Sequence, residues 1–306
     1  MKKINGYFTF QDYDAELLLE LGHRVKEAYG RILLADESEQ LILWAQNIWH
    51  NPIKIPIMSI GDGVKKLKAI QRNWVLYSFD FHRRAQLIQD QLPHVSCKPL
   101  LFRCAIPKAS LGSWTLLEPN CILASSQCSS AFANGEVHFV EDKNGPPNQA
   151  YLKLWEIFTL LEKHPRKEEV CLDLGSSPGG WTWVLGQLGS HVISVDKAPL
   201  DPMVINIPNV EYQQQSVFAI SVLDMKRVDW LFWDVVCYPE RLLKFIMECL
   251  KFKKANHYIC TIKFQGPTDH TVVQKFAQIP GSKLIHLYHN KHELTWIKLD
   301  CLANRD

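Results

Sequence analysis

The chain has 306 residues, of which 47% are hydrophobic and 22% charged, a composition typical of globular proteins with room for two domains. The formal net charge of +2 is too small to indicate a nucleic-acid partner by itself. No apolar run approaches the roughly 18 residues of a membrane-spanning helix, and no long apolar region follows the charged N-terminus, so we expect neither a membrane segment nor a secretion signal.

The number and spacing of the cysteines bear on metal binding and on the redox compartment of the protein. The nine cysteines are scattered, include no Cys-x-x-Cys pair, and lack the spacing of a zinc knuckle, so the sequence predicts no metal site. An odd number of cysteines, several of them within apolar runs, is typical of proteins whose thiols stay reduced. We therefore expect a cytoplasmic protein.

The first 145 residues predict a smaller α+β domain. Within it, residues 97–140 contain short apolar runs separated by Pro, Gly and Ser, which favours strands. The polar, turn-rich segment 141–148 then indicates a domain boundary. We expect an N-terminal domain at 1–145 and a second domain at 146–306.

Basic and aromatic residues alternate between residues 63 and 84. The basic residues are Lys65, Lys66, Lys68, Arg72, Arg83 and Arg84. The aromatic residues are Trp74, Tyr77, Phe79 and Phe81. This mixture suits phosphate contacts combined with base stacking, so we expect the N-terminal domain to bind RNA here. The alternative is an amphipathic segment whose aromatic side chains are core and whose lysines are solvated.

After residue 146 the sequence predicts alternating strands and helices. Helices are predicted at 149–161, 180–188, 239–251 and 269–278. Strands are predicted at 170–174, 191–195, 209–213, 229–233, 257–263, 283–288 and 294–299. This alternation predicts a Rossmann-like α/β fold with a mostly parallel sheet. The last two runs lie too close together for a crossover helix, so they should form an antiparallel pair at the sheet edge.

The strongest single motif is the stretch 170–182, VCLDLGSSPGGWT, in which an apolar strand leads into a glycine-rich turn and a helix start. Its spacing is Gly-x-x-x-Gly-Gly, and Pro178 removes an amide that a phosphate cradle would use, so a nucleoside ligand without a pyrophosphate is favoured. Asp196 ends the next strand, where an acid can accept hydrogen bonds from both ribose hydroxyls. The motif predicts a site for S-adenosylmethionine; the alternative is a Gly-Pro turn in any α/β protein.

Four charged residues fall where such a sheet exposes its carboxyl-end face: Lys153, Asp234, Lys263 and Glu293. Each alone can be a solvated charge, but beside the glycine-rich turn they predict a catalytic cluster. A ribose hydroxyl becomes a good nucleophile when it loses its proton, and a lysine can take that proton if burial or a second cation lowers its pKa. We expect Lys153 beside Lys263 to meet this condition, with the two acids orienting both ammonium groups and no metal required.

Several of these segments resemble the FtsJ-type (RrmJ-like) ribose 2′-O-methyltransferases. They are 152–157, 173–182, 195–199, 234–236 and 262–263. Two more segments, 239–241 and 287–295, resemble the RlmM branch, which methylates a cytidine ribose in 23S ribosomal RNA. The resemblance covers about 146–300. The first 140 residues resemble the RNA-binding part of that branch only weakly and are shorter.

The resemblance implies an S-adenosylmethionine-dependent RNA ribose 2′-O-methyltransferase acting on 23S rRNA. It makes Lys153, Asp234, Lys263 and Glu293 a catalytic Lys-Asp-Lys-Glu tetrad with Lys263 as the proton acceptor. The expected cofactor-binding residues are Asp173, Gly175, Ser177, Pro178, Gly179, Gly180, Trp181, Asp196, Ser216 and Asp234. Two positions depart from the family: Ala150 replaces a serine, and Ser216-Val217-Phe218 replaces an acid followed by Gly-Phe.

Two other functions stay open. Cys237, three residues past Asp234, would be the nucleophile of a pyrimidine C5 RNA methyltransferase, although that reading leaves Lys263 and Glu293 unexplained. The two departures at the cofactor site also allow an RNA-binding or ribosome-assembly factor with a degenerate methyltransferase fold. Measured binding of the cofactor would separate such a factor from an enzyme.

Overall fold

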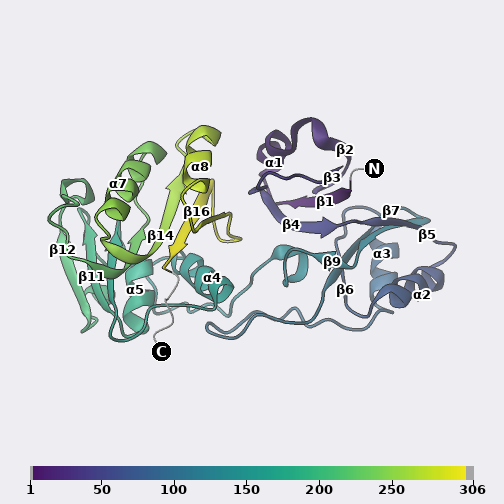
Figure 1. Cartoon of the computed structure of the whole chain (residues 1–306). Coiled ribbons are helices and arrows are strands. Elements are labelled where there is room, and N and C mark those ends of the chain that lie inside the picture. The colour runs from purple at the N-terminus through teal and green to yellow at the C-terminus, as the bar shows by residue number, and fades with distance from the viewer. Residues whose placement is uncertain (1–2, 301–306) are drawn as a thin grey trace, which may run out of the picture. The chain divides into compact units, whose positions relative to one another are not determined.

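The chain divides into two compact units, Met1–Phe139 and Val140–Asp306, and the computed structural model describes residues 3–300 (Figure 1). The sequence suggested a division a few residues later, inside the turn-rich segment that opens unit 2. Within residues 3–300, no helix combines the length and apolar character needed to cross a bilayer.

Unit 1 contains two sheets, ordered β2-β3-β1-β4-β9 and β5-β8-β7-β6. Its strands are β1 (Ile4–Thr9), β2 (Val25–Tyr29), β3 (Ile32–Asp36), β4 (Ala45–His50), β5 (Ile53–Pro56), β6 (Trp74–Leu76), β7 (Gly112–Glu118), β8 (Cys121–Ser125) and β9 (Gln127–Cys128). Its helices are α1 (Asp14–Leu21), α2 (Ile60–Ile70) and α3 (His82–Gln89), with short 3-10 turns at Gly22–Arg24 and Ala133–Gly135. β6 pairs with β7 in parallel and the other strand pairs are antiparallel. This arrangement confirms the α+β class.

The prediction of strands across 97–140 is partly wrong. β7, β8 and β9 lie in this range, but residues 97–111 contain no strand, and Leu100 makes only an isolated bridge with Phe139. Pro99 and Pro107 lack the amide hydrogen that a sheet ladder needs. The apolar run between them therefore stays irregular.

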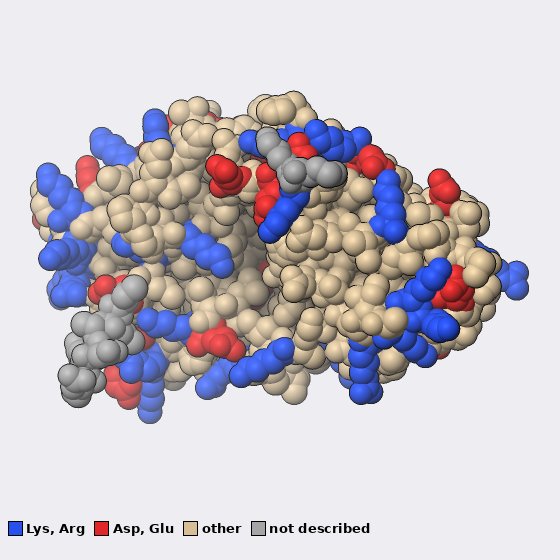
Figure 2. Space-filling view, turned by 45° about the vertical axis from the view of Figure 1, so that its right-hand side comes forward, with Lys and Arg blue, Asp and Glu red and all other residues tan. Residues whose placement is uncertain are grey.

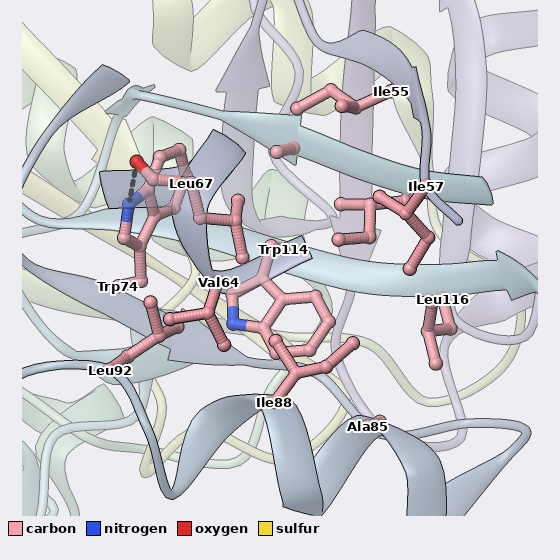
Figure 3. Close-up of a cluster of buried hydrophobic side chains, with 12 residues drawn as sticks. Ile55, Ile57, Val64, Leu67, Trp74, Ala85, Ile88, Leu92, Trp114 and Leu116 are labelled. Atoms are coloured by element: carbon pink, nitrogen blue, oxygen red, sulfur yellow. Dashed lines mark hydrogen bonds between the residues drawn. The ribbon is translucent and has the colours of Figure 1, made fainter. Parts of the chain in front are cut away.

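The second sheet of unit 1 packs against α2 and α3 around two buried tryptophans, Trp74 and Trp114 (Figure 3). α2 follows Ser59, whose Oγ accepts a hydrogen bond from the Asp62 amide at 3.1 Å. The Trp74 ring is fully buried, and its Nε1 donates to the Leu67 carbonyl at 3.0 Å. Trp74 therefore belongs to the hydrophobic core, as the alternative interpretation of residues 63–84 predicted for the aromatic side chains. Its ring cannot stack on a base.

Unit 2 is built on one sheet, ordered β12-β11-β10-β13-β14-β16-β15. Its strands are β10 (Val170–Leu174), β11 (His191–Asp196), β12 (Val210–Gln214), β13 (Val228–Trp233), β14 (Ala255–Lys263), β15 (Ser282–Ile285) and β16 (Glu293–Leu299). Its helices are α4 (Tyr151–Leu161), α5 (Gly180–Gln187), α6 (Pro202–Ile205), α7 (Pro239–Lys251) and α8 (His270–Ala277), with a 3-10 turn at Val217–Ala219. α4 and α5 cover one face of the sheet, and α7 and α8 cover the other (Figure 1).

The strand directions confirm the Rossmann-like prediction. Strands β10 to β14 pair in parallel, and β16 runs antiparallel to both β14 and β15, with β15 at the edge. Because β16 is reversed, its first residue lies at the sheet edge where the parallel strands end, and Glu293 pairs with Lys263. β16 thus brings Glu293 to the carboxyl-end face of the sheet, where α/β sheets bind ligands.

Candidate active site

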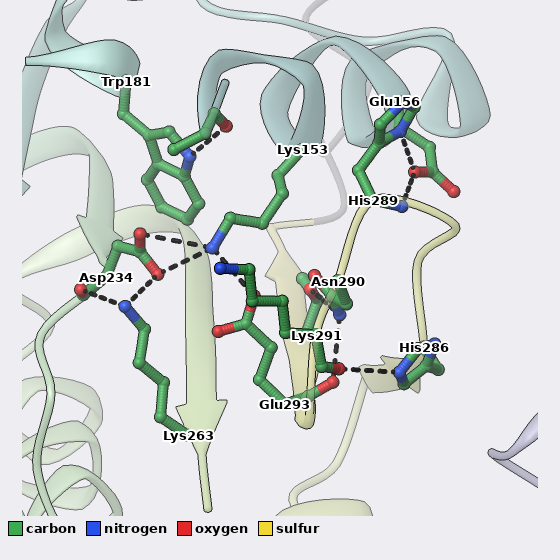
Figure 4. A network of polar contacts seen from close by, with 12 residues as sticks. Lys153, Glu156, Trp181, Asp234, Lys263, His286, His289, Asn290, Lys291 and Glu293 are labelled. Atoms are coloured by element: carbon green, nitrogen blue, oxygen red, sulfur yellow. Dashed lines mark hydrogen bonds and ion pairs between the residues drawn. The ribbon is translucent and has the colours of Figure 1, made fainter. Parts of the chain in front are cut away.

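The four residues predicted as catalytic form one connected cluster, called the tetrad below (Figure 4). The Lys153 Nζ lies 2.9 Å from Glu293 Oε1 and 3.1 and 3.3 Å from the two Asp234 carboxylate oxygens. The Lys263 Nζ lies 3.0 Å from Asp234 Oδ1 and donates to the Asp234 carbonyl at 2.8 Å. Asp234 therefore bridges both ammonium groups, whereas Glu293 contacts Lys153.

Lys153 is the more enclosed of the two lysines. It is 7% exposed, and its Nζ lies 5.7 Å from the centre of the Trp181 ring. Burial by itself lowers the pKa of Lys153, but the carboxylates of Asp234 and Glu293 outweigh burial, so the pKa is raised above its ordinary value. Lys153 is a retained cation that holds two carboxylates in place.

Glu156 supports the tetrad and was missed by the sequence analysis. It lies one turn after Lys153 on α4 and is 2% exposed. Its Oε1 accepts from the Tyr288 amide at 2.8 Å, and its Oε2 accepts from the His289 amide at 3.0 Å and lies 2.7 Å from His289 Nδ1. Glu156 thus fixes the loop that leads into Glu293. The signals in the sequence were its spacing of three residues from Lys153 and its place in segment 152–157, which resembles the family.

Two cavities meet at the tetrad. The first, of about 440 Å³, is lined by Asn148, Gly175, Ser177, Asp196, Lys197, Ser216, Val217, Phe218, Asp234, Val235, Val236 and Lys263. The second, of about 400 Å³, is lined by Asn148, Gln149, Ala150, Leu152, Lys153, Asp234, Lys263, His289, Lys291 and Glu293. They share Asn148, Asp234 and Lys263, so a molecule in one cavity and a molecule in the other can both reach the same lysine.

Half of the predicted cofactor residues line the first cavity: Gly175, Ser177, Asp196, Ser216 and Asp234. The other five are absent from its lining. Pro178, Gly179 and Gly180 form the bend into α5, and the Trp181 Nε1 donates to the Ala150 carbonyl at 3.0 Å. Sequence reasoning missed Asn148, which lines both cavities and whose Oδ1 accepts from the Ala150 amide at 3.1 Å.

The wall of the first cavity is shaped for a nucleoside. Gly175 has φ +81°, and a Cβ there would lie 2.6 Å from Val235 Cγ2, so only glycine fits. The Asp196 carboxylate accepts from the Ser177 amide at 3.0 Å and the Ala198 amide at 2.9 Å. These bonds fix its orientation and leave lone pairs for two ribose hydroxyls. The residues present therefore fit S-adenosylmethionine.

Asp173 does not line the cavity, so its prediction as a cofactor contact needs correction. Its side chain is fully buried beneath the glycine-rich turn, where Oδ2 accepts from the Thr182 hydroxyl at 2.6 Å. The Thr182 hydroxyl also lies 2.9 Å from the Ser194 hydroxyl, which ties α5 to β10 and β11. Asp173 therefore supports the turn from below.

We expect Asp173→Asn to remove a pH-dependent loss of stability. Burial raises the pKa of Asp173 from 3.8 to about 7. Between these two values the native carboxyl is protonated while the unfolded one is ionised, so wild-type stability falls as the pH rises through this window. Thermal melts from about pH 5 to about pH 8 should show a steeper decline in Tm for wild type than for the variant. Parallel curves would contradict this expectation.

The six basic residues predicted to bind RNA lie in unit 1. Lys65, Lys68, Arg72 and Arg83 are exposed, whereas Lys66 and Arg84 are half-buried. The Lys66 Nζ lies 2.9 Å from Asp62 Oδ2 and also donates to a backbone carbonyl. On the face seen in Figure 2, basic and acidic side chains are interspersed. The RNA-binding role of this set stays a prediction.

Unit 2 has a mostly parallel sheet, a glycine-rich turn after the first strand, an acid at the end of the second strand, and a cavity lined by both. These features are typical of the Rossmann-like methyltransferase fold. Residues 147–293 match the model of the family described as FtsJ-like methyltransferase. This match, over just under half of the chain, agrees with the resemblance predicted from the sequence.

Curated relatives match about half of the chain. A Ribosomal RNA large subunit methyltransferase M from Halorhodospira halophila is 32% identical over 49% of this chain and 46% of its own length. One from Pasteurella multocida is 26% identical over 57% of this chain and 54% of its own. The chain thus spans about half the length of the curated relatives it matches.

Among solved structures, a putative hemolysin from Streptococcus thermophilus aligns with 58% of this chain and 76% of its own, at 17% identity and a TM-score of 0.41. A putative ribosomal RNA methyltransferase from Plasmodium falciparum aligns with 50% and 97%, at 19% identity and a TM-score of 0.36. Scores this low carry no argument about function.

Proposed function

We propose that this protein is an S-adenosylmethionine-dependent RNA ribose 2′-O-methyltransferase that acts on large-subunit (23S) ribosomal RNA. The observation that carries the proposal is the position of the tetrad at the meeting point of the two cavities. The ribosomal substrate is suggested by the names of the curated relatives. Unit 1 would bind RNA through its exposed basic residues, Lys65, Lys68, Arg72 and Arg83.

The first cavity would hold the cofactor. Asp196 would accept hydrogen bonds from the ribose hydroxyls, and Gly175 would let the ligand approach the backbone closely. S-adenosylmethionine supplies an electrophilic methyl group. The second cavity would hold the nucleotide to be modified, so that its 2′-hydroxyl faces the shared residues Asp234 and Lys263.

Lys263 would accept the proton of the ribose 2′-hydroxyl at Nζ. It lines both cavities, whereas Lys153 lines only the second. The raised pKa of Lys153 makes that residue a poor base, because its proton is held by Asp234 and Glu293. Asp234 would orient the Lys263 Nζ through the contact at 3.0 Å. In this proposal Lys153 stays a cation and Lys263 accepts the proton.

The two departures from the family pattern leave the first cavity intact. Ala150 contributes its carbonyl to Trp181 and needs no side-chain hydroxyl for that bond. The Ser216 Oγ accepts from the Phe218 amide at 3.3 Å and caps a short turn at the cavity wall. A lost polar contact of this kind costs about 0.5–1.5 kcal/mol, which weakens cofactor binding without abolishing it.

The cysteine-dependent alternative is less well supported. Cys237 is 8% exposed and lies outside the lining of both cavities. Burial raises the pKa of its thiol, which disfavours the thiolate that a C5 methyltransferase needs. The degenerate assembly factor stays a competing function, and calorimetric titration with S-adenosylmethionine discriminates against it if binding is seen.

The proposal is tested by methyl transfer in vitro. Labelled S-adenosylmethionine is incubated with the protein and ribosomal RNA from cells that lack it. We expect label in 23S rRNA, in a dinucleotide that resists alkaline hydrolysis because its 2′-hydroxyl is blocked. Label that alkali releases in a mononucleotide would instead indicate base methylation and overturn the ribose assignment.

A further inference from the structure

Lys291 lies in the loop between β15 and β16 and is exposed. It lines the second cavity together with all four residues of the tetrad. In Figure 4 its side chain extends from the loop toward Lys153 and Asp234. A third ammonium group therefore enters a site that already holds two lysines and two acids.

The charge of Lys291 is not compensated within the site. Glu293 is engaged by Lys153, and Asp234 is engaged by both Lys153 and Lys263. Over residues 3–300, no carboxylate lies within 4.0 Å of the Lys291 Nζ. The Lys291 ammonium therefore carries an uncompensated positive charge, which attracts an anion to the second cavity.

The backbone that carries Lys291 is held in place. Its carbonyl accepts from the Glu293 amide at 2.8 Å and lies 3.0 Å from His286 Nε2. The neighbouring Asn290 Nδ2 donates to the Glu293 carbonyl at 3.2 Å. Glu156 fixes the other end of the loop through Tyr288 and His289. The loop thus presents an exposed cation from a hydrogen-bonded backbone, an arrangement suited to binding a phosphate.

We propose that Lys291 binds a phosphate of the RNA backbone next to the ribose that is methylated. This inference rests on the proposed function, because it assigns RNA to the second cavity. Every internal ribose is flanked by two phosphodiesters, so an uncompensated lysine beside the proton acceptor meets one when the 2′-hydroxyl reaches Lys263. Lys291 is absent from the lining of the first cavity, so its contact serves RNA rather than the cofactor.

The test compares Lys291→Gln, Lys291→Arg and a matched control, Lys283→Gln. Lys283 is an exposed lysine on β15 that pairs with Ile297, four residues along β16 from Glu293. For Lys291→Gln we expect KM for 23S rRNA to rise by about tenfold while kcat changes by less than about threefold. Lys291→Arg should stay near wild type because it keeps the charge, and the control should match wild type. S-adenosylhomocysteine affinity should be the same for all four proteins.

A second measurement needs no methyl transfer. Binding of the full chain to in vitro transcribed 23S rRNA is measured over a range of salt concentrations. Loss of one phosphate contact should reduce the slope of log K against log salt by about 0.7–1 for Lys291→Gln only. An unchanged KM and slope would overturn the proposal, and so would a fall in kcat alone. If wild type transfers no methyl group, the proposed function fails, while the salt slope still decides whether Lys291 contacts phosphate.

Discussion

Lys263→Met is expected to slow methyl transfer to 23S rRNA by about 10²- to 10⁴-fold, the range found when a general base is removed. Methionine keeps the length and apolar stem of the side chain but cannot accept a proton. Asp234 keeps Lys153 as an ion-pair partner, at 3.1 Å, so the variant leaves no unpaired acid in the site. The loss should therefore appear in the rate and not in the folding of unit 2.

The measurement is single-turnover transfer of labelled methyl to rRNA from cells lacking the protein. Calorimetry with S-adenosylhomocysteine should give an affinity within about threefold of wild type, because Asp196 and Gly175 are untouched. Lys275→Met, at an exposed lysine on α8, is the matched control and should keep full activity. Wild-type rates for Lys263→Met would exclude Lys263 as the proton acceptor.

The fold of unit 2 could be predicted because its central strands, such as β10, β13 and β14, are buried on both faces and therefore appear as continuous apolar runs. Predicted and observed bounds agree closely for β10, at Val170–Leu174, and for α7, at Pro239–Lys251. The four-residue helix α6 (Pro202–Ile205) was missed because it is too short to show a helical period.

Prediction was weaker in unit 1. Residues 97–111 have the apolar content of a strand, but they also contain Pro99 and Pro107, which oppose strand pairing, and they stay outside both sheets. Trp74 is a second example. Because it lies among lysines and arginines in the sequence, it was predicted to be part of a surface for base stacking. Its burial against α2 and α3 depends on contacts between segments that the local sequence does not specify.

The members of the tetrad could be found from the sequence because each lies at or next to the end of a strand or on the helix before the first strand of the sheet. The contacts that support the tetrad could not be predicted. Glu156 reaches a loop 132 residues away through its bond to the Tyr288 amide, and no local pattern reports such a contact. The raised pKa of Lys153 likewise depends on Asp234 and Glu293 closing around it. The residues of this site can thus be identified from the sequence, whereas the contacts of Glu156 and the pKa of Lys153 depend on the tertiary structure.

Lys153→Met is expected to destabilise unit 2 as well as to abolish activity. Its ammonium lies 2.9 Å from Glu293, which is 7% exposed and has no second cation partner within residues 3–300. Removing one member of a buried ion pair leaves an uncompensated charge and costs about 3–5 kcal/mol. Asp234 is less affected because Lys263 still lies 3.0 Å from its Oδ1.

The double variant Lys153→Met, Glu293→Gln isolates this effect. It removes both charges, so we expect urea denaturation to show more than half of the lost free energy of unfolding restored, with methyl transfer still absent. The raised pKa of Lys153 sets the pH range: the stabilisation is fully present below the ordinary value of 10.5 and is lost only as the pH rises beyond it. The comparison is therefore made at neutral pH. If the single variant is as stable as the double one, Glu293 does not depend on Lys153 for its charge, and the tetrad is less tightly coupled than its distances indicate.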